Sequence, residues 1–119
     1  MKKSSILRDK SYVFAIRVVK LCNFLRDEKR EFVLSKQLLR SGTAIGALIR
    51  EAEYAQSRAD FVNKLHIALK EANETAYWID LLKDTEYLDE KMFKSIYFDC
   101  DELISLLVAS VKTAKKPNS

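Results

Sequence analysis

An unbroken seven-residue repeat runs through the middle of the chain and constrains its fold more than any other feature. From residue 61 to residue 82, small or apolar side chains recur at alternating spacings of four and three. The members of this repeat are Phe61, Leu65, Ala68, Ala72, Thr75, Ile79 and Leu82. Such a repeat places one stripe along a helix and suits the shallow crossing angle of helices in a bundle. It therefore predicts a long helix packed lengthwise against other helices.

Three further segments carry the helical spacing of apolar residues. Together with the repeat they predict helices over about residues 9–27, 35–55, 58–83 and 89–112. Ser57, with Asp60 three residues later, resembles a capping box at the start of the third helix. The breaks between the helices are short, which makes successive helices antiparallel neighbours.

Composition agrees with this reading. The 119 residues include only two glycines and one proline, so the tight turns of a strand-rich fold have few places to form. The length suits one domain. The prediction is an all-α, antiparallel up-down-up-down four-helix bundle, formed as a single domain by residues 1–119.

Both glycines, Gly42 and Gly46, lie four residues apart in the second predicted helix. Each costs a helix about 1 kcal/mol relative to alanine. Their neighbours Ser41, Thr43 and Ala47 are also small, so this patch lets another backbone come close. The close partner is either a helix of the same bundle or a second subunit. The alternative is a kink at Gly42.

The positive charge is concentrated in the first half of the chain. Residues 1–59 hold 13 Lys and Arg against 6 Asp and Glu, whereas residues 60–119 hold 8 against 11. Lys10, Arg17 and Lys20 share one face of the first predicted helix, and Lys36 and Arg50 lie on one face of the second. Phosphate contacts need only positive charges along a surface, so these five residues are candidates for binding RNA or DNA. The alternatives are a solvated surface or charge complementarity between subunits.

Two acids, Glu71 and Glu74, flank the repeat in the third predicted helix. Arg40 on the neighbouring helix is their natural partner, which gives all three a structural role. The alternative is a pair of solvated acids. Trp78, one turn further on, is expected to be a core or interface anchor.

Nothing in the chain has the pattern of a catalytic or metal site. The one histidine, His66, belongs to no Glu-x-x-His pair, and the nearest preceding arginine, Arg58, stands too far away for an Arg-x4–6-His ribonuclease motif. Cys22 and Cys100 lie in apolar helical contexts and are expected to be buried thiols. We therefore expect no catalytic residue, no metal and no cofactor, which disfavours a hydrolase or nuclease.

No secretory signal and no apolar run of membrane-spanning length is present in the sequence. The expectation is a cytoplasmic protein with no membrane partner.

The run QLLRSGTAIGALIREAEYAQSRADFVNKLHIALKEANETAYWIDLL, residues 37–82, resembles the core signature of the 23S rRNA intervening-sequence proteins. The matching positions are Gln37, Arg40, Ser41, Ile45, Glu51, Ala52, Phe61, Leu65, Ile67, Ala68, Glu71, Glu74, Thr75, Tyr77 and Trp78. The opening DKSYVFAIRVVKL also resembles the first helix of that family, so the resemblance covers roughly residues 8–114. Ala44 and Leu48 depart from it, because the family usually has polar Ser and Asn there.

The resemblance implies a left-handed four-helix bundle that assembles into a ring-like homopentamer, with no known catalytic activity. A related branch, the accessory variability determinant protein of diversity-generating retroelements, binds a reverse transcriptase and nucleic acid. Two hypotheses follow. The chain is either a non-enzymatic oligomer that binds nucleic acid through its basic surface, or an adaptor for another protein such as a reverse transcriptase.

Overall fold

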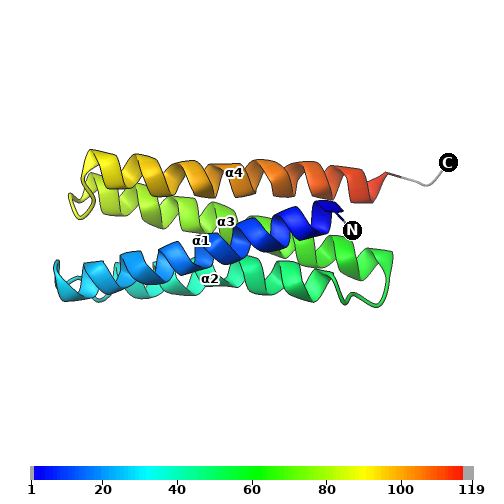
Figure 1. Cartoon of the computed structure of the whole chain (residues 1–119), viewed down its shortest axis with the longest axis horizontal. Coiled ribbons are helices and arrows are strands. Elements are labelled where there is room, and N and C mark those ends of the chain that lie inside the picture. Colours follow the sequence, from blue (N-terminus) through cyan, green and yellow to red (C-terminus); the bar gives the residue numbers. More distant parts are fainter. Residues whose placement is uncertain (1, 117–119) are drawn as a thin grey trace.

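Four helices form the structure, a computed structural model that describes residues 2–116, with side chains from residue 6 onward. They are α1 (Lys2–Asp27), α2 (Leu34–Ala52), α3 (Arg58–Asp84) and α4 (Glu90–Lys115) (Figure 1). No strand occurs between residues 2 and 116. The predicted all-α, four-helix fold is therefore confirmed.

The ends of the helices differ from the predicted ends by a few residues. The first helix already begins at Lys2, because no glycine or proline interrupts the polar residues before residue 9. The second ends at Ala52, three residues early, because the chain must turn before Ser57 can cap α3. The fourth continues to Lys115, just before the one proline.

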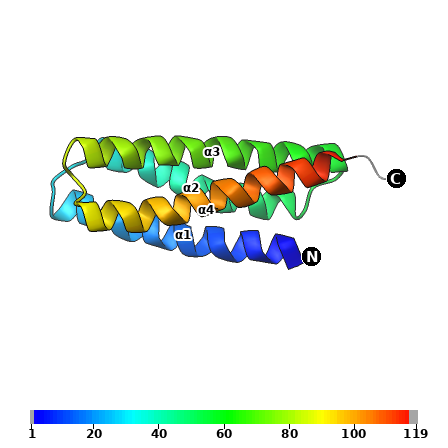
Figure 2. The same cartoon turned by 90° about the horizontal axis from the view of Figure 1, so that it is seen from above.

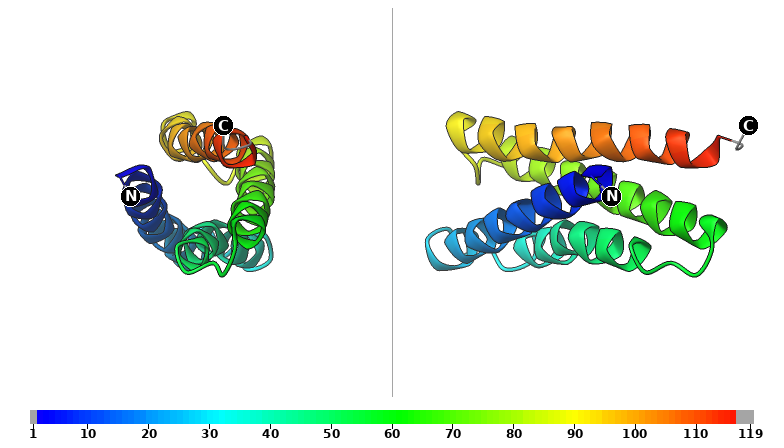
Figure 3. Two further views of the ribbon diagram at one scale, coloured as in Figure 1. Left: turned by 90° about the vertical axis from the view of Figure 1, so that its right-hand side faces the viewer. Right: turned by 45° about the vertical axis from the view of Figure 1, so that its right-hand side comes forward.

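Consecutive helices pack side by side, and α1 also packs on α4, so that four helices surround one core (Figure 2). The α1–α2 and α3–α4 connections lie at one end of the molecule and the α2–α3 connection lies at the other (Figure 1). The molecule is elongated, with extents of 53 × 21 × 20 Å. The contact between α1 and α4 is the sparsest of the four helix pairs. Seen along the axis, these two helices stand apart at the end near the chain termini (Figure 3).

The seven-residue repeat forms the core face of α3. Six of its seven members are buried, and Phe61 at its start is half-buried. The other helices contribute large buried side chains, namely Phe14, Val18, Leu25, Leu38, Ile45, Leu103 and Leu107. Thr75, the one polar member of the repeat, places its Oγ1 2.9 Å from Ser41 Oγ and 2.8 Å from the Glu71 carbonyl oxygen. The repeat therefore keeps its hydroxyl satisfied inside the core.

Side chains cap three of the helices. Ser57 Oγ accepts a hydrogen bond from the Asp60 backbone N–H at 3.0 Å, as predicted, and Asp89 caps α4 through the Met92 N–H at 2.8 Å. In α2 the N-cap residue, Val33, makes no capping hydrogen bond with its side chain. Instead, the carboxylate of Glu31 accepts from the N–H groups of three residues at the start of α2, as described below.

Candidate functional site

The two glycines lie on the side of α2 that packs closely against α1. A Cβ atom built on Gly42 would lie 2.8 Å from Val18 Cγ1, and one on Gly46 would lie 3.3 Å from Ser11 Oγ. The helix runs through both positions without a break. The glycines thus admit a helix of the same chain, and the structure contains no break at Gly42.

Arg40 joins α2 to two acids of α3. Its Nη1 donates to Glu71 Oε1 at 3.2 Å and its Nη2 donates to Glu74 Oε2. Trp78 Nε1 donates to the same Glu74 oxygen at 3.0 Å. The hydrogen bond from Arg40, and after it the one from Trp78, lowers the pKa of Glu74, and the Glu74 hydrogen bond raises the pKa of Arg40. The structure therefore brings these four predicted residues together as a clamp between α2 and α3.

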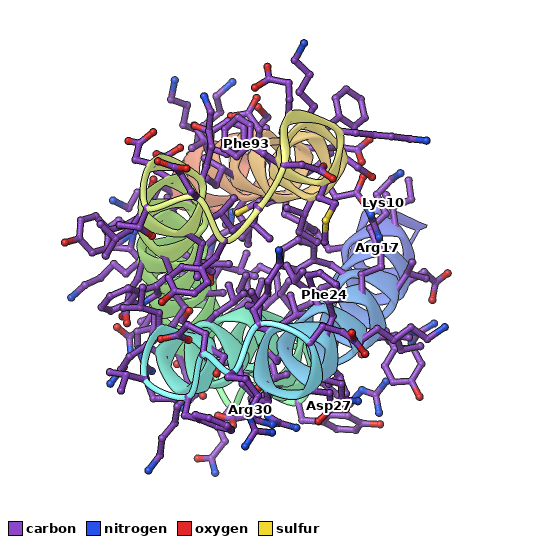
Figure 4. The ribbon with its side chains drawn as sticks, turned by 90° about the vertical axis from the view of Figure 1, so that its left-hand side faces the viewer. Lys10, Arg17, Phe24, Asp27, Arg30 and Phe93 are labelled. Carbon is purple, nitrogen blue, oxygen red and sulfur yellow. The ribbon has the colours of Figure 1, made fainter. Side chains whose placement is uncertain are left out.

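Two of the five candidate phosphate-binding residues are engaged within the bundle. Lys10 Nζ lies 3.2 Å from Glu102 Oε2, and Arg17 pairs with Asp99 and donates to Ser95 Oγ at 2.7 Å. Both side chains lie on the side of α1 that faces α4 (Figure 4). Two ion pairs thus link α1 to α4 at the surface. Sequence spacing could not show this, because the partners are at least 78 residues away.

The other three candidates, Lys20, Lys36 and Arg50, are exposed and make no ion pair with the described side chains of residues 6–116. The Arg50 guanidinium lies 5.8 Å from the centre of the Tyr12 ring. All three belong to α1 or α2. Their charge is available to an external anion.

An exposed apolar face runs along α1, opposite the side that enters the core. Its members are Ile6, Tyr12, Val13, Ile16 and Val19, each between 39% and 57% exposed. We call these five residues the outer face of α1. Sequence reasoning missed this face, although its members also recur three, four or seven residues apart. Several large apolar side chains in contact with water on one helix mark an interaction surface.

The groups that could carry covalent chemistry are isolated. Burial raises the pKa of the Cys22 thiol to about 11 and that of Cys100 to about 12, so both stay protonated at neutral pH. His66 is exposed. Among the described residues, no group of His, Cys, Asp and Glu side chains is arranged to hold a metal ion.

A cavity of about 410 Å³ opens between the ends of the helices, lined by apolar residues that include Leu7, Ile49 and Phe61. Arg58, at its edge, donates to the carbonyl oxygens of Ala114 at 2.8 Å and Lys116 at 3.2 Å. The charge of Arg58 is therefore directed to the end of α4. No histidine or cysteine lines this cavity.

None of the helices within the described part of the chain combines the length and apolar character needed to cross a bilayer.

Comparisons with known proteins agree with the fold and give no activity. The family model described as 23S rRNA-intervening sequence protein matches residues 3–109. A crystal structure of a protein of unknown function, from the S23 ribosomal protein family of Bacteroides thetaiotaomicron, is 58% identical in sequence, with a TM-score of 0.91. The match covers 92% of this chain and 98% of that one. No curated protein matches the chain.

Proposed function

The chain belongs to the 23S rRNA-intervening sequence protein family, and from this premise we propose that it is a non-enzymatic, homo-oligomeric protein that binds nucleic acid through α1 and α2. The observation that carries the proposal is the set of exposed cations Lys20, Lys36 and Arg50, which have no carboxylate partner among the described residues. A cation that is already paired with a carboxylate adds little to the binding free energy of a phosphate. An unpaired cation that binds a phosphate releases a counterion from the nucleic acid, which favours binding. Lys10 and Arg17 take a smaller part, since α4 already binds them.

The test is a fluorescence titration of a labelled RNA hairpin and a matched DNA duplex across a salt series. The triple variant Lys20→Gln, Lys36→Gln, Arg50→Gln should bind more weakly and should reduce the magnitude of the slope of log K against log salt by about 2 to 3. The matched control removes three exposed lysines from α3 and α4, as Lys70→Gln, Lys91→Gln and Lys112→Gln. Equal weakening by both triples means general charge attraction and contradicts a specific surface. Absence of binding at low salt to either ligand ends the nucleic-acid proposal.

The oligomer proposal is supported by the outer face of α1. The positions of the three connections support an up-down-up-down course for each subunit, and the family resemblance supports a ring-like homopentamer. Apolar side chains exposed on one helix gain free energy when a second copy covers them. The mass in solution, measured by light scattering, tests this: we expect a pentamer for the natural chain and smaller species for Val13→Lys, Ile16→Lys. A monomeric natural chain contradicts the proposal.

The same face favours a second function, that of an adaptor for another protein such as a reverse transcriptase. The two functions differ in what covers α1. If Val13→Lys, Ile16→Lys leaves the oligomer intact but abolishes binding to a co-expressed reverse transcriptase, the outer face serves a different protein. If the double variant instead dissociates into smaller species, the outer face of α1 mediates self-association.

A further inference from the structure

The connection between α1 and α2 presents two apolar side chains to solvent in a fixed geometry. Phe32 is 52% exposed and Val33 is 71% exposed, although both are large and apolar. We call residues 29–33 the corner. It lies at the end of the bundle viewed in Figure 4, where Arg30 and Asp27 mark the edge of the molecule.

Glu31 holds the corner in place. Its carboxylate, 7% exposed with the rest of the residue, accepts from the backbone N–H groups of Ser35 at 2.7 Å, Leu34 at 2.9 Å and Val33 at 3.2 Å. The Glu31 carbonyl oxygen also accepts from Ser35 Oγ at 2.8 Å. These bonds satisfy the start of α2 from within the chain. They leave Phe32 and Val33 no route to the core without breaking several hydrogen bonds.

One cation lies against the exposed ring of Phe32, and two more belong to residues close to it in the chain. Arg30 adopts a φ of 53° and places its guanidinium 5.2 Å from the centre of the Phe32 ring. Lys29 Nζ lies 5.9 Å from the centre of the Phe24 ring, and Lys36 lies in the first turn of α2. None of these three cations pairs with a carboxylate in the described part of the chain. The corner therefore combines a flat apolar ring beside a guanidinium with two lysines that lie within four residues of Phe32 in the chain.

The small apolar area of the corner favours a nucleic-acid base over a protein as its partner. A stable protein interface buries about 800 Å² on each partner, far more than one phenylalanine and one valine supply. Val19, the last residue of the outer face of α1, lies about two turns before the helix ends at Asp27, so the corner does not simply continue that face. One aromatic ring with adjacent cations suits a single unstacked base and its phosphates.

We propose that the corner binds unpaired RNA, with one base stacked on Phe32 and the flanking phosphates held by Arg30, Lys29 and Lys36. This inference rests on the proposed nucleic-acid function and extends it from general phosphate attraction to recognition of single-stranded segments. A base within a duplex is stacked on its neighbours and does not reach the ring. The corner therefore distinguishes single strands from duplexes.

The experiment compares an unstructured, labelled 12-nucleotide oligouridylate with a blunt RNA duplex of equal length by fluorescence anisotropy. The variant Phe32→Leu keeps an apolar side chain and removes the flat ring. We expect it to weaken single-strand binding roughly 5- to 100-fold and to leave duplex binding unchanged. Phe32→Trp should preserve single-strand binding, and Arg30→Gln should weaken it. The control is Tyr54→Leu, which removes an exposed aromatic ring after the other end of α2.

The outcomes separate this inference from the proposed function. If the natural chain binds the single strand in a salt-dependent manner and Phe32→Leu binds equally well, the corner is not the site, while the nucleic-acid function stands. If neither ligand binds at low salt, the proposed function fails, and the corner inference fails with it. A change of oligomeric mass in Phe32→Leu without a change in RNA affinity identifies the corner as a subunit contact and overturns the inference. Circular dichroism verifies that each variant is folded.

Discussion

Gly42 and Val18 are in such close contact that no side chain fits between them. A Cβ atom at position 42 would come to 2.8 Å from Val18 Cγ1 and 2.9 Å from Val18 Cγ2. Valine is stiff at χ1 in a helix, so its methyl groups do not move aside easily. This contact fixes how near α1 lies to α2.

We expect Gly42→Ala to destabilise the protein by about 1–2 kcal/mol, because overpacking outweighs the gain of about 1 kcal/mol in helix propensity. Gly46→Ala is the control, since its Cβ would lie 3.3 Å from Ser11 Oγ. At this distance the small cost of overpacking and the gain in helix propensity should nearly cancel. Urea unfolding followed by circular dichroism measures both. The losses caused by Val18→Ala and Gly42→Ala should be less than additive in the double variant, because removal of the Val18 methyl groups makes room for the new Cβ atom. A Gly42→Ala protein as stable as the natural chain would contradict the close contact.

The clamp between Arg40 and Glu74 makes stability depend on pH in a defined direction. Because the pKa of folded Glu74 lies below its ordinary value of 4.5, the ionised group stabilises the fold above about pH 4.5. That stability is lost as the pH falls through the lowered pKa. Glu74→Gln should thus cost a few tenths to about 1 kcal/mol at neutral pH, since both partners are partly exposed.

The stability difference between the natural chain and Glu74→Gln should shrink toward zero as the pH falls below 4.5 and through the lowered pKa of Glu74. Thermal unfolding at several pH values measures it. Trp78 fluorescence reports the same contact, because its Nε1 donates to Glu74. Asp84→Asn, an exposed change at the end of α3, is the control. A difference that stays constant from pH 7 to pH 3 would exclude a role for Glu74 ionisation.

Removal of the Glu31 carboxylate should destabilise the start of α2. Glu31→Ala leaves three backbone N–H groups without their acceptor, and we expect a loss of about 2 kcal/mol. Glu28→Ala, at an exposed position three residues earlier, should change stability by less than about 0.5 kcal/mol. Chemical denaturation compares the two variants. Equal stability of both would mean that water replaces the carboxylate without cost.

The two thiols should resist modification while the protein is folded. Cys22 and Cys100 are fully buried, and their pKa values of about 11 and about 12 keep the thiolate rare at pH 8. A chromogenic disulfide reagent should therefore titrate no thiol in buffer and both thiols in guanidinium chloride. Ser105→Cys places a thiol on the exposed side of α4 and should react at once. Fast reaction of the natural chain at pH 8 would show that the core opens readily.

The fold was predictable wherever a pattern was local. The repeat from Phe61 to Leu82 and the cap at Ser57 are read within a few residues, and the structure confirms them. The cap from Glu31 was not predicted, because a carboxylate outside the N-cap position has no fixed sequence signature. The single-domain assignment and the binding roles of the basic residues stay predictions.

The candidate site was harder to predict, because a charge has a role only in relation to its neighbours. Lys10 and Lys20 look alike in the sequence, yet Lys10 lies beside Glu102 and Lys20 has no carboxylate partner among the described residues. The outer face of α1 was missed for a similar reason. Phe14 and Val18 occupy the core side of this helix, and a second apolar face on the same helix has no partner within a monomer.

The sparse α1–α4 contact has a consequence for how the bundle opens. Each of α2 and α3 has a closely packed neighbour on both sides, whereas α1 and α4 have one such neighbour each. The sparse contact between α1 and α4 includes the ion pairs of Lys10 with Glu102 and of Arg17 with Asp99. Salt screens such exposed pairs and leaves apolar packing intact. We therefore expect graded hydrogen exchange in the native protein, in which the amides of α1 and α4 exchange before those of α2 and α3, and in which rising ionic strength increases this difference.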